Sequence, residues 1–219
     1  MRLLGGIAVY ALAESARRPP LERPYRDFDV AVPAKRGAAA SRVLEATGLI
    51  PDRHFNALHG ARRLIFEAAE GYAVDVLVGE FVMCHALELG DGFETHELTI
   101  APADLLLTKL QIVRIEPKDL ADAAALLLDV QLEPTGIDMR RFVQPLTNDW
   151  GFYHTVALNL PKLAEFGRAR LPTDLAQKLA EHIRKLTAAM EAAPKTLRWQ
   201  LRSRVGERLT WYEIPEELD

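Results

Sequence analysis

Two aspartates one residue apart are the part of this sequence best suited to chemistry. Asp27 and Asp29 alternate with apolar residues in the stretch 26–32. Residues two apart in a β-strand point to the same face, so both carboxylates would share one face. Like charges at that spacing repel unless something compensates them, and Mg²⁺ is commonly bound by one or two carboxylates plus substrate phosphates. The pair therefore predicts either a divalent metal site or the solvated face of an edge strand.

A third acid lies inside the apolar run 73–78, which has the composition of another strand. Asp75 is either a buried carboxylate with a basic partner or the far side of a metal site shared with Asp27 and Asp29. The acidic pair upstream makes us favour the metal site. The run 61–67 also has strand character, and the short glycine-containing link between the two runs predicts a hairpin.

A glycine pair near the N-terminus is suited to holding phosphate. Gly5 and Gly6 follow the short apolar stretch 2–4 and precede a helical pattern over 7–14. A strand, two glycines and a helix leave backbone N–H groups free beside a helix N-terminus, which favours anions. Tight turns also use glycine for steric reasons alone, so the phosphate interpretation depends on the acids that follow.

A lysine and two later aspartates complete the set of candidate residues. Lys109 lies in a leucine-rich helix that should begin near Pro102, where a lysine ordinarily extends its amine to solvent. Asp119 and Asp122 open the next helix, where acids interact favourably with the helix dipole. These ordinary structural roles are the alternatives to a role in catalysis.

The elements around these residues predict an α+β fold, a mixed sheet with helices packed mainly against one face. A helix is expected over 34–47, and 51–60 is expected to be a loop. The stretches 81–89 and 95–100 would add edge strands on either side of a glycine-rich turn.

The rest of the chain is helical in pattern. The polar, proline-containing stretch 131–145 predicts a connection, so we divide the chain into a catalytic domain, 1–130, and a helical C-terminal region, 131–219. The helices of this region are expected over 150–166, 173–192, with Thr173 as its cap, and 195–204.

Composition excludes several classes of protein. The 219 residues carry a formal net charge of −4, so no overall basic field indicates a nucleic-acid-binding protein. Cys84 is the single cysteine, which excludes an internal disulfide and fits a reducing compartment. No stretch approaches the roughly 20 apolar residues of a membrane span. We therefore expect a cytoplasmic protein with no membrane partner.

The candidate residues together resemble a known superfamily. Gly5-Gly6 after a strand, Asp27-x-Asp29 on the next strand and Asp75 on a later one resemble the nucleotidyltransferases related to DNA polymerase β. Within that superfamily, the chain is similar to the abortive-infection type toxin nucleotidyltransferases of bacteria, through Arg23-x-Tyr25-x-Asp27-x-Asp29, then Lys109, then Asp119-x-x-Asp122. The resemblance covers residues 2–130. Relatives of this kind often have serine at the position of Gly6 and threonine at that of Tyr25.

The resemblance implies a metal-dependent transfer of a nucleotidyl group from a nucleoside triphosphate, such as ATP, to an acceptor hydroxyl. It implies that Mg²⁺ or Mn²⁺ ions are bound by Asp27, Asp29 and Asp75, and that the backbone of Gly5 and Gly6 holds the triphosphate. Lys109 would neutralise phosphate charge, and Asp119 or Asp122 would orient Lys109 or the acceptor.

The acceptor and the partners stay open in the sequence. The resemblance implies an RNA end, such as that of tRNA, or another cellular acceptor, and a role as a toxin with a cognate antitoxin. One alternative is an antibiotic-modifying nucleotidyltransferase. Another is a non-catalytic member of the fold that binds nucleotide or a partner protein, although an idle site has no need to keep three unpaired acids together.

Overall fold

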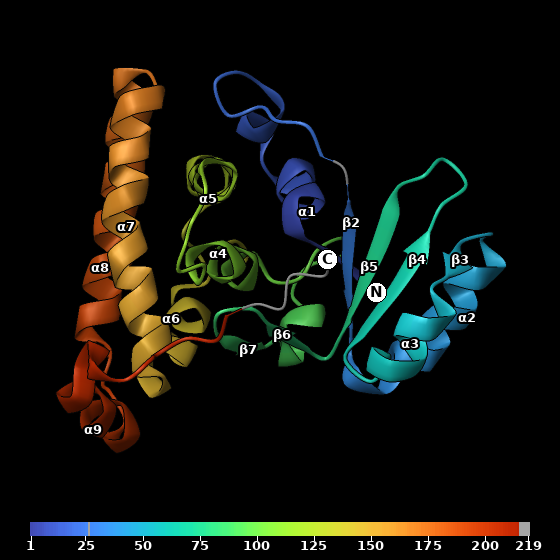
Figure 1. Ribbon diagram of the computed structural model, residues 1–219. Helices are drawn as coiled ribbons and strands as arrows, with labels where there is room; N and C mark the ends of the chain where they lie inside the picture. Colours follow the sequence, from blue (N-terminus) through green and yellow to red (C-terminus); the bar gives the residue numbers. More distant parts are fainter. Residues whose placement is uncertain (26, 215–219) are drawn as a thin grey trace.

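The protein has a mixed α+β architecture in which a sheet lies beside a larger group of helices (Figure 1). The computed structural model describes residues 1–25 and 27–214. Arg26, the first residue of the predicted acidic strand, and residues 215–219, the end of the predicted helical region, lie outside the described part.

Five strands of the described chain form one mixed sheet in the order β1-β2-β5-β4-β3. The central pair, β2 and β5, is parallel, whereas the neighbouring pairs are antiparallel. The predicted hairpin is confirmed as the antiparallel pair of β4 and β5. The strands are β1 (Arg2–Leu4), β2 (Phe28–Val32), β3 (Ile50–Pro51), β4 (Arg63–Glu67) and β5 (Ala73–Val78).

Alternation along β2 gives the sheet two different faces. Val30 and Val32 pack with Ala40 and Leu44 of α2 (Gly37–Ala46) on one face. The opposite face carries Asp29 and Ala31, and α1 (Gly5–Leu12) packs there (Figure 1). The prediction that helices cover mainly one face is therefore wrong, because the valine face of β2 and β5 needs its own apolar cover.

Two segments between the strands differ from the predictions. The expected loop 51–60 contains α3 (Arg53–His59), whose first turn is capped by the carboxylate of Asp52 accepting from the N–H of Phe55. The expected edge strands are replaced by a separate two-stranded sheet of β6 (Glu80–Val82) and β7 (Ala86–Glu88). The stretch 95–100 forms an isolated bridge to β1 and no strand. Short 3₁₀ helices occur at Glu14–Arg17, Ala34–Arg36, Gly90–Phe93 and Gly206–Arg208.

The second half is helical, as predicted, with one helix more in its described residues than the sequence indicated. That helix is α6 (Met139–Asn148), which contains Pro145. Its apolar spacing buries Phe142 and Leu146, and this packing outweighs the helix-breaking proline. Thr173 is the first residue of its helix, so its predicted capping role is wrong. The other helices are α4 (Pro102–Leu110), α5 (Pro117–Asp129), α7 (Trp150–Arg170), α8 (Thr173–Ala192) and α9 (Leu197–Val205).

The larger of the two apolar clusters joins both halves of the chain. It runs from Leu4 at the end of β1 to Met190 in α8, and its centre is the leucine-rich pair α4 and α5. Helices α6, α7 and α8 pack around this pair from outside (Figure 1). Within the described residues, no helix combines the length and apolar character needed to cross a membrane.

Candidate active site

The glycine turn at the start of α1 lies directly against the acidic strand. Gly5 follows β1 and has a φ of 62°, in the left-handed region that favours glycine. A Cβ atom at Gly5 would lie 1.9 Å from Oδ2 of Asp29, so the close approach also requires glycine. The carboxylate of Asp29 therefore faces the N-terminal end of α1.

The second glycine is covered by a different segment. A Cβ atom at Gly6 would lie 2.3 Å from Nη2 of Arg23 and 2.7 Å from a ring carbon of Tyr25. The guanidinium of Arg23 stacks on the Tyr25 ring, 4.2 Å from its centroid. The hydroxyl of Tyr25 is buried and has no hydrogen-bond partner among the described residues. The loop before β2 thus closes over the first turn of α1.

The acids of the two parallel strands are neighbours on one face. Asp29 of β2 is in register with Asp75 of β5. Burial raises the pKa of Asp29 to about 6, with further increases from Asp75 and Asp27, while Lys109 and Arg63 act in the opposite direction. Asp27 itself is exposed and lies just before β2. These five side chains therefore share one electrostatic neighbourhood centred on Asp29.

Asp75 already has a cationic partner. Nε of Arg63 donates to both carboxylate oxygens, at 2.9 and 2.8 Å, and Nη2 donates to Oδ2. Asp75 therefore matches the alternative reading of a carboxylate with a basic partner. Within the described residues, no three His, Cys, Asp or Glu side chains are placed to hold a metal ion. The predicted convergence of Asp27, Asp29 and Asp75 into one metal-binding cluster is not met as these side chains lie.

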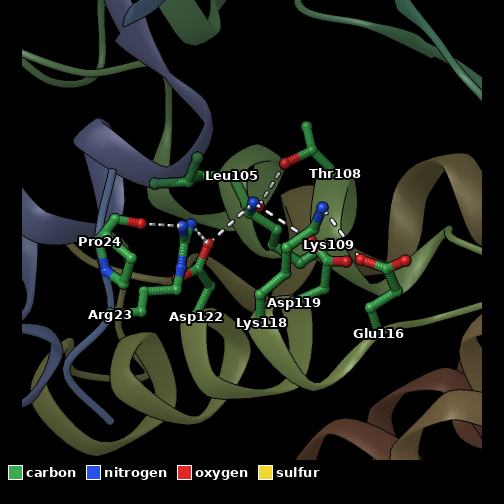
Figure 2. A network of polar contacts seen from close by, with 9 residues as sticks. All are labelled: Arg23, Pro24, Leu105, Thr108, Lys109, Glu116, Lys118, Asp119 and Asp122. Carbon is green, nitrogen blue, oxygen red and sulfur yellow. Dashed lines mark hydrogen bonds and ion pairs between the residues drawn. The ribbon is translucent and has the colours of Figure 1, made fainter. Parts of the chain in front are cut away.

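Lys109 is buried and ion-paired, which excludes the alternative that it extends its amine to solvent. It is 9% exposed, and its ammonium lies 2.9 Å from Oδ2 of Asp122 and 3.4 Å from Oδ1 of Asp119 (Figure 2). Arg23 holds Asp122 from the other side, with Nε donating to Oδ1 at 2.9 Å and Nη2 to Oδ2 at 2.7 Å. Neither aspartate caps α5 with its side chain.

These contacts form a chain of charges from the loop before β2 to α5. Asp122 bonds both cations, and Figure 2 shows its carboxylate between Arg23 and Lys109. Lys109 also acts electrostatically on Asp29, so the chain reaches the acidic strand. The structure thus brings all of the predicted site residues into one region of the molecule, at the junction of α1, β2 and the pair α4 and α5.

Two arginines of this region were not assigned roles from the sequence. Arg63 could have been found from the hairpin, because it faces Leu77 across the turn and so shares the face of Asp75. No local signal predicts that Arg23 bonds Asp122, since 99 residues separate them.

A cavity of about 360 Å³ lies away from these residues, at the N-terminal ends of α4 and α6. Its half-buried cation, Arg141, is bonded to Asp104, Asp91 and the carbonyl of Leu89. Burial raises the pKa of Asp104 to about 6 against the effect of Arg141. Arg141 therefore ties α6 to α4 and to the segment before α4, a structural role that leaves the acidic strand as the candidate site.

Neither a family model nor a curated protein matches the chain.

Proposed function

We propose that this protein transfers a nucleotidyl group from a nucleoside triphosphate to an acceptor hydroxyl, with Mg²⁺ or Mn²⁺. The observation that carries the proposal is the carboxylate of Asp29, which faces the glycine turn of α1 and lies in register with a second acid. Phosphate suits the turn and a divalent cation suits the acids, so a metal-bound triphosphate fits both.

Several groups of the site are suited to bind the triphosphate. The first turn of α1 offers backbone N–H groups, and within the described residues no side chain caps this end of the helix. Lys109 lies within electrostatic range of Asp29 and adds a positive charge held in place by Asp119 and Asp122. Fixed positive groups of this kind stabilise phosphate charge without reorganising during the reaction.

The donor set at the acidic strand fits a divalent ion. Asp27 and Asp29 would hold Mg²⁺ or Mn²⁺, with phosphate oxygens and water completing the coordination. When bound, the ion would neutralise charge on the phosphates. Asp29 repels both neighbouring carboxylates, Asp27 and Asp75, so the site carries acidic charge that a cation would compensate.

The reaction requires positioning more than covalent chemistry from the protein. The acceptor oxygen bonds to the α-phosphorus, the bond from that phosphorus to the oxygen bridging to the β-phosphate breaks, and pyrophosphate leaves. The hydroxyl proton passes to a carboxylate of the site or to water. We propose an RNA end, such as that of tRNA, as the acceptor. We further propose that the protein is a toxin whose activity a cognate antitoxin restrains.

The test offers each α-labelled nucleoside triphosphate with total RNA and, separately, with aminoglycosides. We expect label in RNA with the wild type and none with Asp29→Asn or after chelation of the metal. Asp174→Asn, which changes an exposed acid of α8, should label RNA as the wild type does. Label found in the aminoglycosides alone would show that the acceptor is a small hydroxylated molecule and not RNA. Transfer that survives Asp29→Asn would overturn the proposed site.

A further inference from the structure

Arg63 and Asp75 form a two-point ion pair inside the candidate site. The guanidinium donates from Nε to both oxygens of Asp75 and from Nη2 to Oδ2. Paired N–H donors on a carboxylate are the strong form of this interaction, since both partners are charged and their geometry is fixed. A divalent ion on Asp75 would therefore have to displace Arg63 or bind beside a permanent positive charge.

The hairpin and α3 hold Arg63 in this position. Arg63 faces Leu77 and Ile65 faces Asp75, so Arg63 lies on the same face as Asp75, one diagonal step away. Its guanidinium also lies over the ring of Phe55 in α3, 5.9 Å from the centroid. The partner of Asp75 is thus built into the sheet and supported from a neighbouring helix.

The same guanidinium faces the site as well as Asp75. Arg63 and Asp29 influence one another electrostatically, which places the arginine close to the central acid of the site. The side chain of Arg63 is 39% exposed, and within the described residues its Nη1 atom makes no hydrogen bond. Arg63 therefore has free donors that a phosphate oxygen can accept.

We propose that Arg63 takes the place of a second divalent ion, so that the triphosphate-bound site holds a single metal ion on Asp27 and Asp29. Asp75 is then a positioning residue for Arg63, and the guanidinium contacts the phosphates. This inference rests on the proposed function and deepens it. It replaces the three-carboxylate metal site that the sequence predicted with two carboxylates, one ion and one arginine.

The test counts Mn²⁺ bound per chain with a non-hydrolysable α,β-methylene triphosphate, using electron paramagnetic resonance to measure free Mn²⁺. We expect one Mn²⁺ in the wild type and two in Arg63→Met, because loss of the guanidinium frees Asp75. The double variant Arg63→Met/Asp75→Asn should return to one ion, which would assign the additional ion to Asp75.

Asp75→Asn keeps the shape of the site and serves where Arg63→Met does not fold. A positioning role predicts that Asp75→Asn changes Mn²⁺ affinity less than about threefold, whereas Asp29→Asn lowers it about tenfold or more. Two ions in the wild type, or a tenfold loss in Asp75→Asn, would overturn the single-ion site and leave the proposed function standing. If the wild-type complex binds no Mn²⁺, both the single-ion site and the proposed function are wrong.

Discussion

The absence of a side chain at Gly6 is required by a distant loop and not by the backbone. Gly6 has no left-handed φ, yet Arg23 and Tyr25 fill the space into which a Cβ would project. Arg23 has little freedom to move away because Nε and Nη2 donate to Asp122 and Nη1 donates to the carbonyl of Pro24.

Gly6→Ala should lower the free energy of unfolding by about 1–3 kcal/mol, as overpacking does in a tight site. The loss should appear although alanine has a higher helix propensity than glycine by about 1 kcal/mol. Urea denaturation measures the change. Gly37→Ala in α2 is the matched control, since its Cβ would meet a methyl group of Val78 at 3.2 Å and should shift stability by less than about 1 kcal/mol. If the two variants are equally stable, the loop that carries Arg23 and Tyr25 moves aside at little cost in free energy.

Among the elements, α4 and α5 are joined by charge as well as by leucines. Lys109 of α4 binds Asp119 and Asp122 of α5, and Arg23 extends the connection to the loop before β2. If Lys109 is removed, Asp122 keeps Arg23, but Asp119 loses the cation beside it. A buried carboxylate without its partner is costly, so the lysine that binds phosphate in our proposal also stabilises the fold.

Lys109→Met should therefore lower the free energy of unfolding by about 3 kcal/mol. The double variant Lys109→Met/Asp119→Asn should recover about 1 kcal/mol or more, because the acid left unpaired is now neutral. Urea denaturation of the four proteins in this cycle measures both values. Lys118→Met removes an exposed ion pair with Glu116 and should change stability by no more than about 0.5 kcal/mol. If Lys109→Met behaves like Lys118→Met, the buried network contributes nothing to stability.

At the scale of the whole molecule, the two predicted regions share one core. Every residue of α4 is buried, and so are the ten consecutive residues of α5 from Asp119 to Leu128. A helix buried on all sides needs neighbours on all sides. Helices α6, α7 and α8, which lie beyond the predicted boundary at residue 131, provide part of that cover.

The fragment 1–130 should accordingly fail to unfold cooperatively, because its leucine-rich helices lose their outer cover. Near-ultraviolet circular dichroism and urea titration test this against the full chain. The fragment 1–196 is the control: it lacks α9, which buries none of its own described residues, and should keep a cooperative transition. A sharp transition in the fragment 1–130 would mean that this region folds alone.

Local patterns in the sequence were sufficient for the strands around the acids, the hairpin, the glycine turn and most of the helices. Alternation, 3.6-residue spacing, glycine and proline act on neighbouring residues, so they can be read without knowing the fold. The closeness of Gly5 to Asp29 did not follow from these patterns, because it depends on the pairing of β1 with β2, which only the structure shows.

The tertiary structure decided which charges meet. Arg63 pairs with Asp75, Arg23 pairs with Asp122, and Lys109 is buried between two acids. These pairs form because elements that are distant in the sequence pack together. The same packing places α2 on the second face of the sheet and keeps Pro145 inside α6, against local preference. Side-chain types indicate which chemistry is available. Only the packing of distant elements determines which acid is paired with an arginine and which one, in our proposal, binds a metal ion.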